Sequence, residues 1–250
     1  MRRAILPAVL AALCAAPAMA GDDIRFTAAP GDPAAASVEA MVPAAKARIE
    51  GFFGQPFGEP LHVTLASDRA AFNAAFPAAW GMSQTECWMV GVGVADFLVL
   101  LSPADWAKEA CEHDAADPVE AREILTHELV HMYHGQHNPT RDFTGADDIG
   151  WFVEGLAVLA SGQLDAKRQA EAAQAIRDGA APKSLATAWS GPHRYAVAGS
   201  LVQYVDETYG RATVVALLPA VTQADVLGKL GVTEPELLDR WKAWALKRAG

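Results

Sequence analysis

Residues 117–135 read DPVEAREILTHELVHMYHG and carry the pattern of one buried helix. Asp117 can cap the helix with its side chain, Pro118 suits the first helical position, and Glu120 adds an acid in the first turn. Gly135 can end the helix. Apolar residues occupy most of the positions in between, so we expect this helix to lie in the interior of the protein.

The middle of this helix contains the pentapeptide His127-Glu128-Leu129-Val130-His131, an HExxH. Histidines four residues apart lie about 6 Å from each other on one face of a helix, so both imidazoles can reach one tetrahedral zinc ion. Glu128 lies one step round the helix, where its carboxylate can reach a metal-bound water without binding the metal. The alternative is a helix whose histidines form hydrogen bonds within the core.

A catalytic zinc site on this pentapeptide needs a third protein ligand, and Glu154 is the favoured candidate. It is the only charged residue in the segment 151–160, WFVEGLAVLA, and Asp147-Asp148 can cap a helix there. A lone carboxylate among apolar residues needs a metal or a cation such as arginine, and we expect the metal. The small residues Gly155 and Ala157 predict close packing of this helix against the HExxH helix.

His137 is the other candidate for the third ligand. The stretch 127–137, HELVHMYHGQH, approaches the pattern HExxHxxGxxH, in which the last histidine binds the metal. It departs from that pattern because its glycine is at position 135 instead of 134 and no methionine follows Met132. We expect His134 to line the cleft or to cap the helix end. A metal-buffering protein that uses all four histidines of this stretch is a further alternative.

HELVH followed by WFVEGLAVLASG resembles the gluzincin zinc metallopeptidases, specifically the peptidase-MA-like group, whose second helix carries the pattern W-x-x-E-G-x-A. In order and spacing the resemblance covers roughly residues 35–245, including the later stretch 193–210. It implies a zincin-like fold and a set of site residues with distinct roles. These are His127, His131 and Glu154 as zinc ligands, Glu128 as general base, and Tyr195, or failing it His193, as the hydrogen-bond donor to the tetrahedral oxyanion.

The chain departs from the resembled family at two places. The thermolysin branch orients its first histidine with an aspartate four residues after the ligand glutamate, and Val158 stands there in this sequence, so the partner of His127 is not identified. The aminopeptidase branch carries a Gly-x-Met-Glu-Asn strand that holds the amino terminus of the substrate. The nearest stretch, residues 91–96, lacks this motif, which argues against an aminopeptidase.

The pattern along the whole chain predicts an α+β fold, with a small N-terminal sheet and helices followed by a mainly helical C-terminal lobe. We expect one domain over residues 21–250, with an α/β lobe at about 32–136 and a helical lobe at about 137–250. The predicted N-terminal elements are a helix within 32–54, a strand at 61–65, a short helix opened by Ser67-Asp68, and one or two strands within 88–101, the second at 95–101. This last strand could offer a free edge to an extended peptide.

Composition and the N-terminal sequence indicate where the protein acts. Thirty acidic against twenty basic residues give a net charge of −10, which disfavours nucleic acid as a partner. Met1-Arg2-Arg3, the mostly apolar stretch 4–16 and Ala18-Met19-Ala20 predict a signal peptide over residues 1–20 and export to the periplasm or the medium. We expect no transmembrane segment in the mature chain.

Two cysteines, Cys87 and Cys111, remain after removal of the signal peptide. An even number of cysteines in an exported protein, without CxxC spacing, predicts one structural disulfide. Two separate buried thiols are the alternative.

Together these features predict an exported zinc-dependent metallopeptidase, an endopeptidase that acts on a peptide or protein substrate. The alternative is a peptidase-like binding or assembly module that retains zinc without catalysis.

Overall fold

The structure, a computed structural model, describes residues 23–81 and 83–249. These residues form one small sheet and a larger set of helices, so the predicted α+β class is confirmed. The predicted signal peptide lies outside the described residues.

The sheet has four strands: β1 (Ile24–Ala28), β2 (Leu61–Ala66), β3 (Gly91–Val94) and β4 (Phe97–Leu101). Their order is β1-β2-β4-β3, with β1, β2 and β4 parallel and β3 antiparallel to β4. The expected free edge at residues 95–101 is therefore wrong, because β4 lies between β2 and β3. The edge strands are β1 and β3, and β3 is the one that packs against α4.

The N-terminal lobe adds the helices α1 (Ala35–Phe53), α2 (Arg69–Ala74), α3 (Pro103–Glu109) and α4 (Pro118–Gln136), with the short 3-10 helix η1 (Ala78–Trp80). α1 provides the crossover that the parallel strands β1 and β2 require. Asp68 caps α2 and Asp117 caps α4 through their side chains, as their sequences predict. α4 continues one residue past Gly135.

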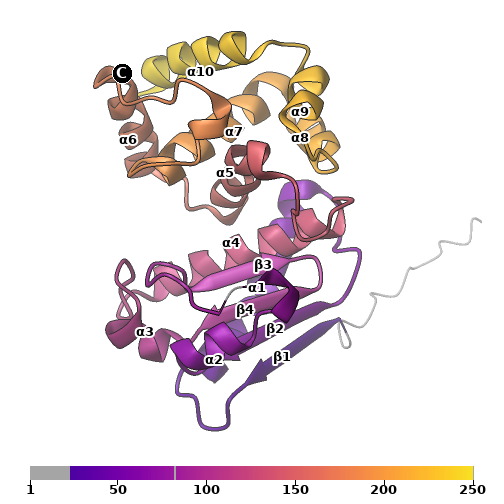
Figure 1. The fold of residues 1–250 in the computed structure, drawn as a ribbon, viewed down its shortest axis with the longest axis vertical. Helices are drawn as coiled ribbons and strands as arrows, with labels where there is room; N and C mark the ends of the chain where they lie inside the picture. The colour runs from indigo at the N-terminus through magenta and orange to yellow at the C-terminus, as the bar shows by residue number, and fades with distance from the viewer. Residues whose placement is uncertain (1–22, 82, 250) are drawn as a thin grey trace, which may run out of the picture.

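The C-terminal lobe consists of helices: η2 (Asp147–Ile149), α5 (Gly150–Ser161), α6 (Ala166–Arg177), η3 (Leu185–Thr187), α7 (Arg194–Tyr209), α8 (Arg211–Leu217), α9 (Gln223–Leu230) and α10 (Glu234–Arg248). Figure 1 shows α6 to α10 at one end of the molecule, the sheet at the other, and α4 and α5 between them. No helix in the described part of the chain combines the length and the apolar character needed to cross a membrane.

Gly155 on α5 corrects one packing prediction. A β-carbon there would overlap the carbonyl oxygen of Ala198, so the close approach that Gly155 permits is to α7, although α5 also packs against the HExxH helix as expected. Different glycines bring the HExxH helix close to its neighbour: β-carbons at Gly91 and Gly93 of β3 would both overlap Glu128 on α4. Both helices of the site are thus fixed by backbone contacts that only glycine permits.

Cys87 and Cys111 form the expected disulfide. It joins the segment before β3 to the segment between α3 and α4, and these two segments lie beside the cleft described below. The alternative of two separate buried thiols is wrong, and both cysteines are exposed.

Candidate metal centre

Three side chains from α4 and α5 meet at one point between the lobes. The Nε2 atoms of His127 and His131 are 3.1 Å apart, and Oε2 of Glu154 is 3.3 Å from the first and 3.5 Å from the second. These residues form a group that could hold a metal ion. The three residues expected from the sequence are therefore brought together.

The distances in this group fit a small tetrahedral ion. Ligand atoms at about 2.0–2.1 Å from a tetrahedral zinc lie roughly 3.3 Å from one another. The three measured separations bracket that value. Two Nε2 atoms facing each other cannot both be acceptors without a proton or a cation between them, so the donor set suits a metal.

A partly buried carboxylate favours a cation at this point. His127 and His131 are each 6% exposed, and Nδ1 of His131 is a buried atom that has no hydrogen-bond partner among the described residues. Burial alone would raise the pKa of Glu154, but His131 and His127 outweigh this effect and hold its pKa well below the usual range. The carboxylate is therefore charged and directed at the two imidazoles. The alternative arginine pair of Glu154 is not found among residues 23–81 and 83–249.

Gln163 is the partner of His127 that the sequence analysis did not identify. Its Oε1 lies 2.7 Å from Nδ1 of His127 and accepts a hydrogen bond from it, which leaves Nε2 free to bind a metal. Gln163 is 8% exposed and lies just after α5.

Glu128 lines the cleft beside the three side chains that could hold a metal and is not one of them. Its side chain lies against Gly91, where a β-carbon would be 2.6 Å from Cγ of Glu128. Burial raises the pKa of Glu128, which is only partly offset by the nearby histidines. A carboxylate with a raised pKa beside a metal is suited to accept and return a proton.

Tyr195 lies on the other side of the cleft, at the start of α7. Its ring centroid is 6.5 Å from that of His127, and the Arg194 guanidinium lies 5.0 Å from the ring. Burial raises the pKa of Tyr195, so its hydroxyl stays protonated and can donate a hydrogen bond.

The remaining histidines singled out by the sequence do not join the centre. Nε2 of His134 is bonded to the carbonyl of Leu218, and Nδ1 of His137 donates to the carbonyl of Tyr133. Both the third-ligand role of His137 and the four-histidine buffer are therefore wrong. His134 is fully buried and does not line the cleft. His193 pairs with Glu171 and lies outside the lining of the cleft.

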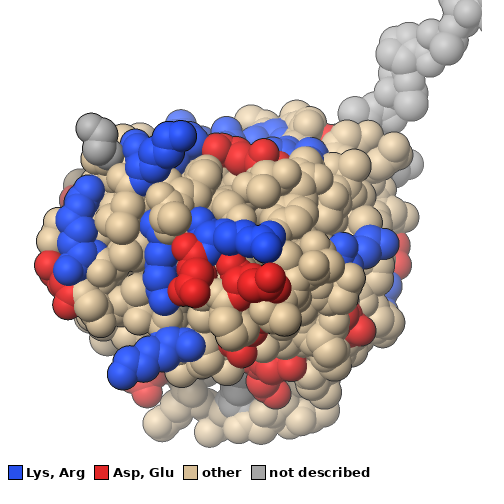
Figure 2. All heavy atoms as spheres, turned by 90° about the horizontal axis from the view of Figure 1, so that it is seen from above, with Lys and Arg blue, Asp and Glu red and all other residues tan. Residues whose placement is uncertain are grey.

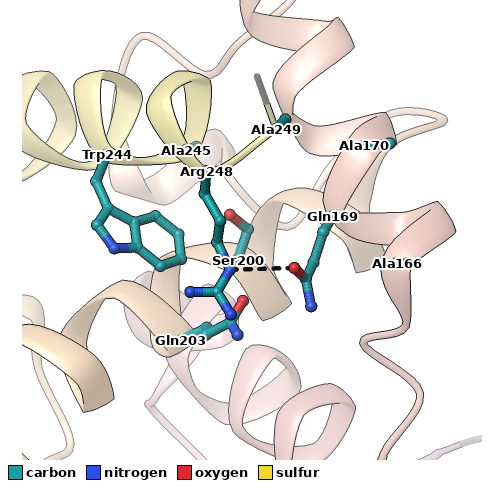
Figure 3. Close-up of a pocket in the computed structure, with 9 residues that line it drawn as sticks. All are labelled: Ala166, Gln169, Ala170, Ser200, Gln203, Trp244, Ala245, Arg248 and Ala249. Atoms are coloured by element: carbon teal, nitrogen blue, oxygen red, sulfur yellow. Dashed lines mark hydrogen bonds between the residues drawn. The ribbon is translucent and has the colours of Figure 1, made fainter.

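Two cavities adjoin the centre, and His127, Glu128 and Tyr195 line both of them. The larger has a volume of about 780 Å³ and is lined by His127, His131 and Glu154, and the smaller has about 460 Å³ and extends along the N-terminal half of α4. A third cavity of about 320 Å³ lies between α6, α7 and α10, away from the metal ligands. There Arg248 donates a hydrogen bond to Gln169 (Figure 3).

Comparisons with protein-family models, with curated proteins and with solved structures found no match to this chain. The class of site is therefore defined by its geometry alone: a buried cluster of two histidines and one glutamate, able to hold a metal ion, beside an uncoordinated glutamate in a cleft.

Proposed function

We propose that the protein is a zinc-dependent metallopeptidase of the gluzincin type, with a zincin-like fold, that hydrolyses internal peptide bonds. The single observation that carries this proposal is the convergence of His127, His131 and Glu154 at separations of 3.1–3.5 Å. Three protein ligands leave one tetrahedral position open, which is the arrangement of catalytic zinc. Zinc suits this mixed nitrogen and oxygen donor set.

When bound, zinc would polarise the carbonyl of the scissile bond and lower the pKa of a bound water molecule, so that this water can lose a proton near neutral pH. Glu128 takes the proton from the attacking water and passes it to the leaving amine. Gln163 keeps His127 in the tautomer whose Nε2 binds metal. Tyr195 donates a hydrogen bond to the developing oxyanion.

The edge strand β3 is suited to hold an extended peptide. The carbonyl of Val90 accepts a hydrogen bond from Leu101 at 2.8 Å, and bonded pairs alternate along an antiparallel ladder. The backbone groups of Gly91 and Gly93 therefore point away from β4 toward the free edge. A peptide paired there passes Glu128 and continues into a cavity on either side, which favours cleavage within a chain over removal of a terminal residue.

Export belongs to the same proposal. Its basis is the signal-peptide pattern of residues 1–20, and the Cys87–Cys111 disulfide supports an oxidising compartment.

Two variants test the function. Glu128→Gln should keep one zinc per chain and lose roughly 10²- to 10⁴-fold in hydrolysis of a peptide library, because only the proton acceptor is removed. Glu154→Ala should lose both zinc and activity. Hydrolysis that survives Glu128→Gln would refute the role of Glu128. A zinc-loaded wild type that cleaves no peptide between pH 5 and 9 would instead favour the binding or assembly module.

A further inference from the structure

The larger cavity beside the metal-binding residues has apolar walls contributed by both lobes. Its volume of about 780 Å³ lies within the range of pockets that enclose organic ligands. Most of the apolar side chains in its wall are partly exposed, so a ligand can reach their surfaces. The partly exposed ones include Trp80, Val92, Val94, Phe143 and Trp189, and Val153 is buried.

The smaller cavity has a different chemistry. Charged side chains of both signs line it, among them Glu112, Glu123, Lys167 and Arg168. One half of a bound peptide therefore meets mainly apolar side chains and the other half meets charged ones, on the two sides of His127, His131 and Glu154.

The direction of β3 assigns each half to a side. Gly91 lines both cavities, whereas Gly93 and Val94 line only the larger one. Antiparallel pairs are the commoner kind of strand pair, so we take an added peptide to pair antiparallel to β3. Such a peptide runs from Val94 toward Gly91, and its amino-terminal half lies in the larger cavity. The bond to be cleaved then lies near Gly91 and Glu128.

Phe143 is held at the end of this cavity by a strained loop. Arg141 and Phe143 both have left-handed backbone conformations, with φ of 56° and 62°. Such conformations persist where the surroundings fix them. The carbonyl of Arg141 accepts a hydrogen bond from Ala95 at 3.1 Å, and its guanidinium pairs with Glu59 and Asp96. The loop is thus fastened to the turn between β3 and β4.

We propose that this cavity selects peptides with a large apolar side chain, best an aromatic one, on the amino side of the cleaved bond. This inference rests on the proposed peptidase function and names Phe143 and Trp189 as the residues that determine specificity. Ring–ring contacts add to the apolar area that such a side chain buries. Asp142 and Asp147, also in the lining, disfavour an acidic side chain there.

Internally quenched peptides that differ only in the residue before the cleaved bond test the selection. With zinc-loaded enzyme, we expect kcat/KM for phenylalanine to exceed that for alanine by roughly tenfold or more, with aspartate lowest. Mass spectrometry of the products identifies the cleaved bond. Equal kcat/KM values, or a preference that follows the residue after the bond, would overturn the proposal.

Variants of the cavity wall test the two residues. Phe143→Asn removes one ring while retaining a residue that tolerates a positive φ, and Trp189→Ala removes the other. Each should reduce the preference for phenylalanine over alanine to about threefold or less. The matched control Trp244→Ala lies on α10, outside both cavities, and should leave the preference unchanged. Zinc content is measured for every variant. If Phe143→Asn loses zinc, the preference measured for Trp189→Ala alone tests the role of the cavity wall.

A binding measurement separates this inference from the proposed function. In zinc-loaded Glu128→Gln, fluorescence anisotropy of labelled peptides should give a Kd for the phenylalanine peptide roughly tenfold below that for the alanine peptide. Selective binding without hydrolysis by the wild type would refute the peptidase but keep the selection. Hydrolysis without selectivity in either assay would refute the selection alone.

Discussion

Gln163 shows how one side chain outside the metal-binding set can control it. Its amide oxygen lies 2.7 Å from Nδ1 of His127 and keeps the proton of the imidazole on that atom. The amide is neutral, so it adds no negative charge, as a carboxylate in the same place would. Among the described residues, the group that could hold a metal then contains a single carboxylate, that of Glu154.

Gln163→Leu should lower the affinity for zinc by roughly 10- to 100-fold, because His127 loses the acceptor that fixes its tautomer. Competition with a chelator of known affinity measures this change. Gln169→Leu, a change of the same kind in the third cavity, should leave the affinity unaltered. Equal affinities for all three proteins would show that the 2.7 Å contact has no part in holding the metal.

His134 makes stability depend on pH. Burial lowers its pKa from 6.5 to about 3, and its Nδ1 is buried without a partner among the described residues. Because the folded state binds fewer protons than the unfolded state, the stability from neutral His134 is complete above about pH 6.5 and is lost as the pH falls toward 3.

Between pH 6.5 and 5, this residue should cost the wild type roughly 2 kcal/mol in the free energy of unfolding. His134→Gln should show a correspondingly smaller loss over the same interval. Urea unfolding of the wild type and of this variant measures the two losses, with a chelator present so that both proteins are free of metal. If the free energy of unfolding changed equally with pH in the wild type and in His134→Gln, His134 would not be a neutral, buried residue.

Local patterns predicted the elements of the site well and their neighbours less well. The cap at Asp117 and the apolar positions that follow are consecutive in the chain, so α4 could be predicted almost to its last residue. Gln163 could not be found in this way, because its contact with His127 spans 36 positions. β1 was not predicted, and the edge position of β3 depends on pairing between distant strands.

Glycine contacts decide how closely the elements approach one another. Gly155→Ala should lower the free energy of unfolding by about 1–3 kcal/mol, because the added methyl group overlaps the backbone of α7. Gly228→Ala on α9, where a β-carbon meets no atom within 4 Å, should instead raise it by up to about 1 kcal/mol. Denaturant unfolding of both variants measures the difference, and a stabilised Gly155→Ala would contradict the packing of α5 on α7.

At the scale of the molecule, two lobes are joined around the cleft. Seen from the C-terminal lobe, acidic and basic side chains are interspersed over the visible face (Figure 2). Arg194 of α7 links the lobes, lying 3.9 Å from Glu112 and over the ring of Trp88.

The disulfide between Cys87 and Cys111 should stabilise this arrangement. It closes a loop with a sequence separation of 24, so replacing both cysteines with serine should lower the free energy of unfolding by about 2–4 kcal/mol. Reduction of the wild type should produce the same loss, and the serine variant should not respond to the reductant. A reductant effect of equal size on both proteins would assign the loss to another cause.

The most direct measurement is an anomalous difference map at the zinc absorption edge, recorded from crystals of the zinc-loaded protein. The account predicts one peak at about 2.0–2.2 Å from Nε2 of His127, Nε2 of His131 and the carboxylate of Glu154. A peak at His137, or one from which Glu154 is turned away, would contradict it.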